Sequence, residues 1–325
     1  MQYTQALVIS PAMSDEAKKA YFIEAGASHA GQRLDNFLLN QLKGVPKSHI
    51  YRILRSGEVR VNKGRKKPNY RLEATDQIRI PPVRVSDKQE IGIPDAVLGK
   101  LEQTILFEDP HVLVINKPAG LAVHSGSGIQ YGVIEILRKL RPEADMLELV
   151  HRLDRDTSGC LVIAKSRPAL MQLHEQFRSD EGMKKHYRAI LAGRWAGGEK
   201  LIDAPLIKNT LKGGERMVTV DEAGKEARSL FTPIEYYANA THMEIRLFTG
   251  RTHQIRVHAA HAGFPVAGDP KYGNTEFNQQ LKSKGYKRMY LHAHTLGFKL
   301  DREYNITAPL DNEWQELLKI LSLQS

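Results

Sequence analysis

The concentration of positive charge in one segment is the feature that most restricts how this chain can fold. Between Gly31 and Val85 there are 13 Lys/Arg against 4 Asp/Glu, a net charge of +9, whereas the rest of the chain has 34 against 33. A concentrated positive field binds polyanions, because neutralised phosphates release their counterions. A merely solubilising surface would spread the charge more evenly. Since 325 residues are also long for one core, we predict two domains, one of them basic.

The remaining composition excludes several classes of protein. Hydrophobic residues make up 41% and charged residues 26% of the chain, as in ordinary globular proteins. A single cysteine, Cys160, excludes an internal disulfide framework and fits a reducing compartment. The N-terminal sequence does not resemble a secretion signal, and no apolar run is long enough for a membrane-spanning helix. We therefore expect a cytoplasmic protein.

Two amphipathic helices are predicted at the start of the basic segment. The first covers the run RLDNFLLNQL, whose apolar residues fall on one helical face. The second is expected to have Ser48 as its N-cap and to end at Gly57. On its outer face Lys47, Tyr51 and Arg55 recur at four-residue steps. This basic row with an aromatic ring in its middle can lie on phosphates.

Short strands and a linker complete the predicted organisation. Residues 58–62 and 77–80 alternate apolar and polar side chains, and two prolines close the second run. A polar stretch without periodicity follows and is interpreted as a linker. The chain is therefore predicted to have four parts: an N-terminal arm (1–30), a basic domain (31–82), a linker (83–100) and a second domain (101–325).

The second domain mixes strands and helices without the regular alternation of a parallel sheet. This pattern predicts an α+β fold with a mixed, largely antiparallel sheet flanked by helices. Strands are expected at residues 111–116, 160–164, 186–192, 242–248 and 289–293. Helices are expected at residues 133–140, 168–177 and 252–262.

The segment HRLDRDTSG, residues 151–159, contains the densest group of ionisable side chains next to apolar sequence. It lies between Leu149-Val150 and the apolar run CLVIA. Charged side chains pinned between core segments need partners, because burying an unpaired charge costs several kcal/mol. The segment is therefore either a mutually paired structural network or an active site, and physical reasoning alone favours neither.

This segment resembles the signature of the RluA-type pseudouridine synthases. Three further stretches match the same family in order: HVLVINKPAGLAVHSG upstream, then KKHYRAILAG and LFTGRTHQIRVHAAHAGFPVAGDPKYG downstream. The basic domain, with its run SGEVRVNKGRKKP, is similar to the S4 RNA-binding domain. The resemblance implies isomerisation of uridine to pseudouridine in RNA. Because that reaction adds no group and changes no oxidation state, no cofactor is expected.

The family resemblance also implies site residues. Asp154 is the implied catalytic carboxylate, acting either by attack on C1′ or through a glycal. Tyr187 is expected to stack on the target uracil and to take part in removing the C5 proton, although an ordinary strand aromatic is the alternative. Arg251 is implied as the ion-pair partner of Asp154, with a phosphate contact as the competing role. Ile255 is expected to wall the base pocket.

Arg152 is implied as the residue that enters the RNA stack when the target base leaves it. Its alternative role is an ion pair with Asp156, which we otherwise assign to local hydrogen bonds. The 13 histidines include His253, His258 and His261 on one predicted helix, but no zinc-binding spacing appears, so no metal is expected.

The implied partner is large-subunit (23S) ribosomal RNA, bound by a protein that needs no more than one subunit. Two other functions are compatible with parts of the sequence. A non-catalytic RNA-binding factor in ribosome assembly would use the basic domain alone. A carbohydrate-cleaving hydrolase would use paired carboxylates, but it leaves the basic domain unexplained.

Overall fold

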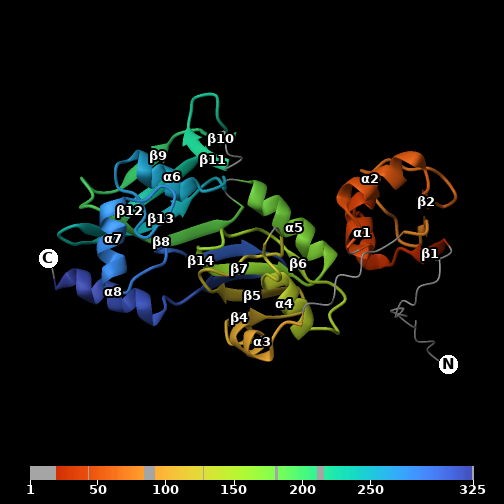
Figure 1. Ribbon diagram of the computed structural model, residues 1–325, viewed down its shortest axis with the longest axis horizontal. Helices are drawn as coiled ribbons and strands as arrows, with labels where there is room; N and C mark the ends of the chain where they lie inside the picture. The colour runs from red at the N-terminus through yellow and green to blue at the C-terminus, as the bar shows by residue number, and fades with distance from the viewer. Residues whose placement is uncertain are drawn as a thin grey trace. The chain divides into compact units, whose positions relative to one another are not determined.

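The computed structural model describes residues 20–42, 44–83, 92–126, 128–179, 182–210 and 216–323. The chain divides into two compact units, Met1–Ile91 and Gly92–Ser325 (Figure 1). Most of the predicted N-terminal arm lies outside the described residues. Within the described residues, no helix is long and apolar enough to cross a membrane.

The first unit packs two helices against a small antiparallel sheet with the strand order β1-β3-β2. Its elements are β1 (Tyr21–Glu24), a 3-10 turn (Ala27–His29), α1 (Leu34–Gln41), α2 (Lys47–Ser56), β2 (Arg60–Val61) and β3 (Gln77–Ile80). Phe37, Ile50 and Ile78 are completely buried between these layers. The predicted pair of helices and the strand at residues 77–80 are therefore present.

Two details of the first unit differ from the prediction. Strand β1 falls within the segment assigned to the arm, and it is ordered because Tyr21–Glu24 pair with Ile80–Gln77 of β3. Helix α2 begins before Ser48, since the extended Pro46 is its N-cap and the Pro46 carbonyl accepts N–H groups of the first turn. Gly57 ends the helix as predicted, with a φ of 75° that suits glycine.

The second unit contains a ten-stranded mixed sheet, as the α+β prediction required. Its main path runs β4-β5-β7-β14-β8-β13-β12-β9, with β6 beside β7 and β15 beside β14, and a separate hairpin joins β10 and β11. Among the described strands of the sheet, only β14 and β7 pair in parallel. The strands are β4 (Ile105–Glu108), β5 (Val112–Lys117), β6 (Glu148–Leu149), β7 (Ser158–Ala164), β8 (Lys184–Ala192), β9 (Lys200–Asp203), β10 (Leu206–Thr210), β11 (Arg216–Val220), β12 (Arg228–Tyr236), β13 (Ala240–Leu247), β14 (Leu291–Lys299) and β15 (Glu303–Thr307).

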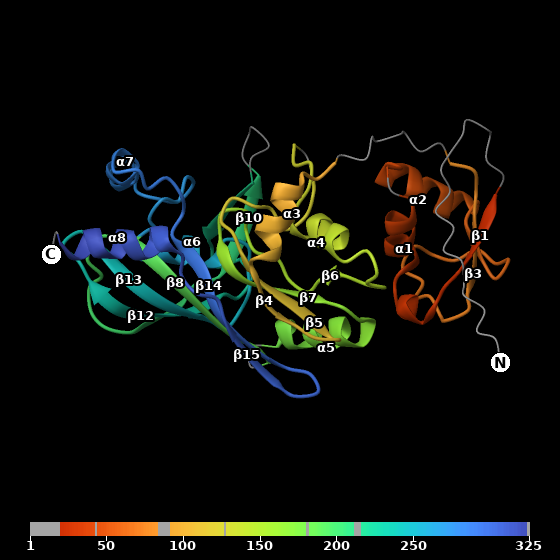
Figure 2. The same cartoon turned by 90° about the horizontal axis from the view of Figure 1, so that it is seen from below.

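Helices cover both faces of this sheet. They are α3 (Asp95–Glu102), α4 (Val133–Leu140), α5 (Arg167–Arg178), α6 (Gln254–His261), α7 (Thr275–Ser283) and α8 (Asn312–Ser322). Figure 2 shows α3 and α4 on one side of β5 and β7, with α5 on the other. Side chains of β8 alternate in the same way: Ala189 and Leu191 pack with α6, whereas Ile190 packs with α7 and α8.

Tyr187 marks the junction between two of these cores. It packs against the cluster that contains α3 and α4 and against the cluster that contains α6. One face of the sheet is therefore divided between two groups of helices, and the seam between them lies at β8 and β14. The candidate site described below lies along this seam.

Helix α3 is a correction to the predicted linker. We interpreted residues 83–100 as aperiodic, but Val97, Leu98 and Leu101 form an apolar stripe on one face of this helix. They pack against the cluster of α4, and Leu101 is only 2% exposed. The helix is short, so packing rather than intrinsic propensity stabilises it.

Candidate active site

The loop that carries Asp154 is fixed at both ends by the core. It joins β6 to β7, and the buried side chains of Leu153 and Thr157 anchor it. The Thr157 N–H donates to the Asp154 carbonyl across 3.2 Å and closes a tight turn. The Asp154 side chain itself stays 27% exposed. Folding therefore presents one carboxylate at the surface of a rigid turn.

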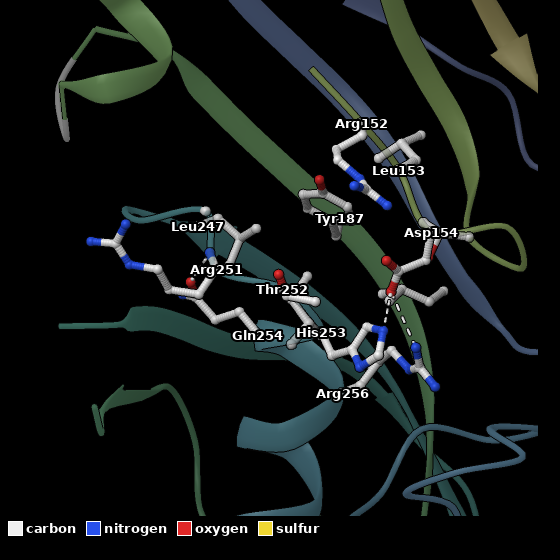
Figure 3. A pocket seen from close by; sticks show the side chains of 14 residues that line it. Arg152, Leu153, Asp154, Tyr187, Leu247, Arg251, Thr252, His253, Gln254 and Arg256 are labelled. Atoms are coloured by element: carbon white, nitrogen blue, oxygen red, sulfur yellow. Dashed lines mark hydrogen bonds and ion pairs between the residues drawn. The ribbon is translucent and has the colours of Figure 1, made fainter. Parts of the chain in front are cut away.

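Asp154 faces a pocket of about 180 Å³ that lies along the seam of the sheet (Figure 3). Four segments build it: the loop of Asp154, strand β8, strand β14, and the stretch that runs from the end of β13 through the following turn into the start of α6. The pocket is lined by Arg152, Leu153, Asp154, Thr157, Tyr187, Leu247, Gly250, Arg251, Thr252, His253, Gln254, Ile255, Arg256 and Leu291. All five site residues predicted in this domain therefore line one cavity, although they are far apart in the sequence.

The ion pair of Asp154 is a correction to the sequence analysis. We expected Arg251 as its partner, but Arg256 donates from Nη1 to Asp154 Oδ2 across 3.1 Å. Arg251 donates instead from Nε to the carbonyl of Glu226 at 2.8 Å. In Figure 3 its guanidinium points away from the Asp154 carboxylate.

The position of α6 explains why Arg256, and not Arg251, pairs with Asp154. Arg251 lies in the exposed turn before the helix, and its side chain extends toward the carbonyl of Glu226. Arg256 lies inside the helix and is only 7% exposed. A guanidinium at such a buried position requires acidic partners, and Asp154 and Asp269 supply them. In the sequence, Arg256 lies inside the predicted helix 252–262 among apolar residues. That position could have identified it as the partner of Asp154.

Gln254 holds the turn that precedes α6. Its side-chain oxygen accepts from the Thr249 hydroxyl and from the Arg251 N–H, both at 2.9 Å. Its amide group donates to the Arg228 carbonyl at 3.0 Å and to the Ser229 hydroxyl at 2.9 Å. Because both ends of this buried amide are satisfied, the pocket wall is rigid at this point.

Tyr187 lies across the pocket from this turn, with its ring between the two cores. Burial raises the pKa of its hydroxyl above the usual value, and the negative charge of Asp154 raises it further. The phenol therefore stays protonated at neutral pH. A protonated phenol with an accessible ring can stack on a base and donate a hydrogen bond.

Arg152 and Asp156 do not form the ion pair that was the alternative to a role in RNA binding. Asp156 pairs with its neighbour Arg155 at 3.1 Å. Arg152 is exposed, and no residue in the described ranges forms a hydrogen bond or an ion pair with its guanidinium. Its planar cation is therefore available to a ligand at the rim of the pocket.

Within the described parts of the chain, no group of three or more His, Cys, Asp or Glu residues could hold a metal ion. His258, one of the three histidines on the predicted helix, has a structural role. Its two ring nitrogens lie 3.0 Å from the Ser229 hydroxyl and 2.9 Å from the Ala204 carbonyl. Burial lowers its pKa, so it is a neutral core residue.

The first unit presents the predicted basic row on α2. The Lys47 ammonium lies 5.8 Å from the centre of the Tyr51 ring, and Lys47 and Arg55 are exposed. The Tyr51 hydroxyl donates to Asp35 at 2.8 Å, which leaves the ring face as its free surface.

A second basic cluster, not identified from the sequence, lies at the C-terminal end of α2. Arg65, Arg60 and Arg79 donate to the successive carbonyls of Ser56, Gly57 and Glu58. These bonds satisfy backbone groups at the helix end and fix three guanidinium groups close together. They line a surface hollow with the 63% exposed side chain of Phe22.

Comparison with known proteins extends these observations. A family model described as RNA pseudouridylate synthase matches residues 111–261, and a model of the S4 domain matches residues 32–78. The chain is 52% identical over 316 residues to the ribosomal large subunit pseudouridine synthase C of Salmonella typhimurium. That alignment covers 95% of this chain and 99% of the relative. The protein of the same name from Pasteurella multocida is 53% identical over 300 residues, covering 91% and 92% of the two chains.

The fold is also similar to that of a solved structure. Human RNA pseudouridylate synthase domain containing 4 superimposes with a TM-score of 0.59 at 25% sequence identity. The match covers 70% of this chain and 96% of the human chain. Sequence and fold comparisons therefore agree for the second unit, which contains the pocket.

Proposed function

Because this chain belongs to the RNA pseudouridylate synthase family and carries an S4 domain, we propose that it isomerises specific uridines to pseudouridine in large-subunit (23S) ribosomal RNA. Asp154 is the proposed catalytic carboxylate, and no cofactor takes part. One observation carries this assignment: Asp154 has one oxygen paired with Arg256 and lines the same pocket as Tyr187. The lone cysteine and the reaction on ribosomal RNA together suggest a cytoplasmic location.

The reaction requires a group that stabilises positive charge on ribose. The N1–C1′ bond of uridine breaks, the uracil turns while bound, and C5 forms a bond to C1′. A fixed carboxylate stabilises an oxocarbenium-like sugar, as in glycosidases, or forms a bond to C1′. The same carboxylate can instead accept a proton from C2′ and open a glycal route.

Tyr187 and Ile255 are proposed to hold the uracil. The tyrosine ring offers a stacking face, which contributes about 1 to 3 kcal/mol per base. Since burial keeps the phenol protonated, its hydroxyl can donate to a uracil carbonyl more readily than it can accept the C5 proton. Ile255 is only 4% exposed and forms part of the apolar wall.

Arg152 and Arg251 are proposed to bind the RNA around the pocket. Arg152 has no partner within the described chain, so its guanidinium can fill the space left when the target base is extruded. Arg251 is assigned to a phosphate contact, because the residue is exposed and its bond to Glu226 uses only Nε. Away from the pocket, Lys47, Tyr51 and Arg55 are proposed to bind phosphates, together with the arginine cluster at the end of α2.

The first experiment replaces the carboxylate. We expect Asp154→Asn to reduce tritium release from 5-tritiated uridine in 23S ribosomal RNA by about 10⁴-fold or more, because removal of a central catalytic group has effects of that size. Asp156→Asn is the matched control, since it removes a neighbouring carboxylate that pairs only with Arg155 in the described structure. Its rate should stay within about threefold of the wild type.

A measurable rate in Asp154→Asn close to that of the control would remove Asp154 from the mechanism. Mapping of pseudouridine in the RNA by carbodiimide labelling and primer extension checks the product directly. Failure to detect any new pseudouridine with the wild-type protein would favour the alternative of a non-catalytic assembly factor.

A further inference from the structure

The two oxygens of the Asp154 carboxylate have different surroundings. Oδ2 lies 3.1 Å from Arg256 Nη1 and 3.6 Å from His253 Nε2. No hydrogen bond or ion pair from any described residue engages Oδ1, which Figure 3 shows on the side of Tyr187 and the pocket. One oxygen is therefore held from behind, and the other is open to a ligand.

Arg256, the first of the two groups that support Oδ2, is fixed by a second carboxylate, that of Asp269. Asp269 accepts from Arg256 Nε at 2.7 Å and from Nη2 at 2.8 Å, a bidentate pair. Asp269 is 1% exposed and is itself held by the N–H groups of Lys271 and Tyr272. Burial alone would raise the pKa of Asp269, but the bonds and charge of Arg256 outweigh it and hold the pKa low. The guanidinium therefore cannot rotate freely.

His253, the second group that contacts Oδ2, is held by Tyr272, which lies on the same loop as Asp269. The Tyr272 hydroxyl accepts from the Val218 N–H at 3.1 Å and lies 2.9 Å from His253 Nδ1. Burial lowers the pKa of His253, so the ring is neutral at neutral pH. When Tyr272 donates its single proton to Nδ1, the ring proton resides on Nε2, which faces Asp154.

The backbone of His253 supports a specific role for this contact. Its φ of 56° and ψ of 18° lie in the left-handed region, which non-glycine residues adopt only occasionally and mostly as Asn, Asp or His. Strained residues of this kind persist where surrounding contacts fix them, and they cluster at functional sites. The Tyr272 ring also lies 5.1 Å from the Arg256 guanidinium, so the two supports contact each other.

We infer that Asp269 and Tyr272 are positioning residues that fix Arg256 and His253 against Oδ2 of Asp154 and thereby aim Oδ1 at the ribose. Both residues lie on the loop between α6 and α7, and neither lines the pocket. This inference rests on the proposed role of Asp154. A reacting oxygen displaced by about 1 Å can reduce a rate by about 100-fold, so distant supports of this kind can control catalysis.

The first test removes one oxygen atom. In Tyr272→Phe we expect the single-turnover rate of tritium release from 23S ribosomal RNA to fall by about tenfold, with the Kd for this RNA unchanged within about twofold. Tyr290→Phe is the matched control, because the buried Tyr290 also donates its hydroxyl, to Glu313 at 2.6 Å, but packs in the cluster of α7 and α8 and not in that of α6. The control should keep the wild-type rate and Kd.

The second test removes the anchor of Arg256. In Asp269→Asn we expect a fall of about 100-fold in the single-turnover rate, again without a change in Kd. Asp109→Asn is its control, since Asp109 also accepts two backbone N–H groups, but its third donor is a tyrosine hydroxyl where Asp269 has an arginine. Thermal unfolding of each variant is compared with that of its control. A rate loss that follows the loss of folded protein would overturn the inference.

A double substitution tests whether Tyr272 acts through His253. His253→Asn keeps a residue that tolerates the left-handed backbone and removes the Nε2 contact. In that background Tyr272→Phe should reduce the rate by less than about twofold, because the contact through which Tyr272 acts, from His253 to Asp154, is already lost. Full additivity of the two losses, or a wild-type rate in Tyr272→Phe alone, would overturn the inference.

The result for Asp154→Asn separates this inference from the proposed function. If Asp154→Asn is active, the proposed function itself fails. If Asp154→Asn is inactive while Tyr272→Phe and Asp269→Asn both retain the wild-type rate, only the positioning role fails.

Discussion

Lys117 is completely buried next to the loop that carries Asp154, and burial lowers its pKa to about 7 although the negative charges of Asp156 and Asp154 raise it. Its ammonium donates to the carbonyls of Pro118 and Leu121, both at 2.8 Å, and to that of Arg155 at 2.9 Å. In the charged form, three N–H groups thus match three carbonyl acceptors, and one of these belongs to the loop that carries Asp154. A single side chain therefore ties that loop to the end of β5.

Replacing this lysine should destabilise the fold. In Lys117→Met the three carbonyls lose their donor, and a buried polar group without a partner costs about 1 to 3 kcal/mol. We expect the free energy of unfolding, measured with urea, to fall by about 3 kcal/mol or more. Lys165→Met is the control: Lys165 forms a partly exposed pair with Glu108 at 2.8 Å, whose loss should cost less than about 1 kcal/mol. Equal losses in the two variants would contradict this account.

At the residue scale, the sequence indicated Asp154 as a candidate but did not indicate the residue with which it pairs. Asp154 lies in a short contiguous motif that can be recognised without a structure. Its contact with Arg256 joins residues 102 positions apart, and only the packing of α6 shows which arginine turns inward. The sequence also gives no sign of the left-handed backbone of His253, so the contact of this residue with Asp154 became visible only in the structure.

At the element scale, strands β7 and β14 meet where the loop that carries Asp154 enters the sheet. Gly159 has a φ of 107°, and a Cβ at this position would lie 2.2 Å from the Ala293 carbonyl oxygen. The parallel pairing of Gly159 with Ala293 therefore requires glycine for both conformation and space. This pairing fixes the start of β7, directly after the loop that carries Asp154.

Gly159→Ala should separate these two strands. We expect it to destabilise the protein by about 4 kcal/mol or more or to prevent folding, because the neighbouring atoms belong to the backbone and cannot rotate away. Gly99→Ala in α3 is the matched control, since no atom lies within 4 Å of its added Cβ. That change should stabilise the helix by about 0.5 to 1 kcal/mol. Urea unfolding compares the two, and a loss below about 1 kcal/mol in Gly159→Ala would refute the steric argument.

Elements with strong local patterns were predicted, whereas elements defined by pairing were not. The prediction for α4 has the bounds found in the structure, and β5, β7, β8 and β13 begin and end within a few residues of their predicted positions. Strands β9 and β12, at one end of the sheet, carry exposed side chains on both faces, so alternation is weak. They form because they pair with each other and, for β12, with β13.

At the scale of the whole molecule, the two units have separate cores. The core of the first unit is a single cluster, and its partly buried neighbours also come from that unit. The clusters of the second unit draw only on residues after the boundary at Gly92. Each unit should therefore fold without the other, as independent cores allow. The uneven charge in the sequence predicted this division, although its boundary could be located only from the packing.

The contribution of the first unit to RNA binding should appear in the salt dependence. The fragment 92–325 should stay folded, bind 23S ribosomal RNA more weakly, and show a slope of log K against log salt reduced by about 0.7 to 0.9 for each phosphate that it no longer neutralises. In the full chain, Lys47→Gln with Arg55→Gln should reduce the slope by about 1.5 to 2. Lys299→Gln with Arg302→Gln removes the same charge from the second unit and serves as the control. Binding titrations across a range of salt concentrations measure these slopes, and an unchanged slope in the fragment would show that the basic unit does not hold the RNA.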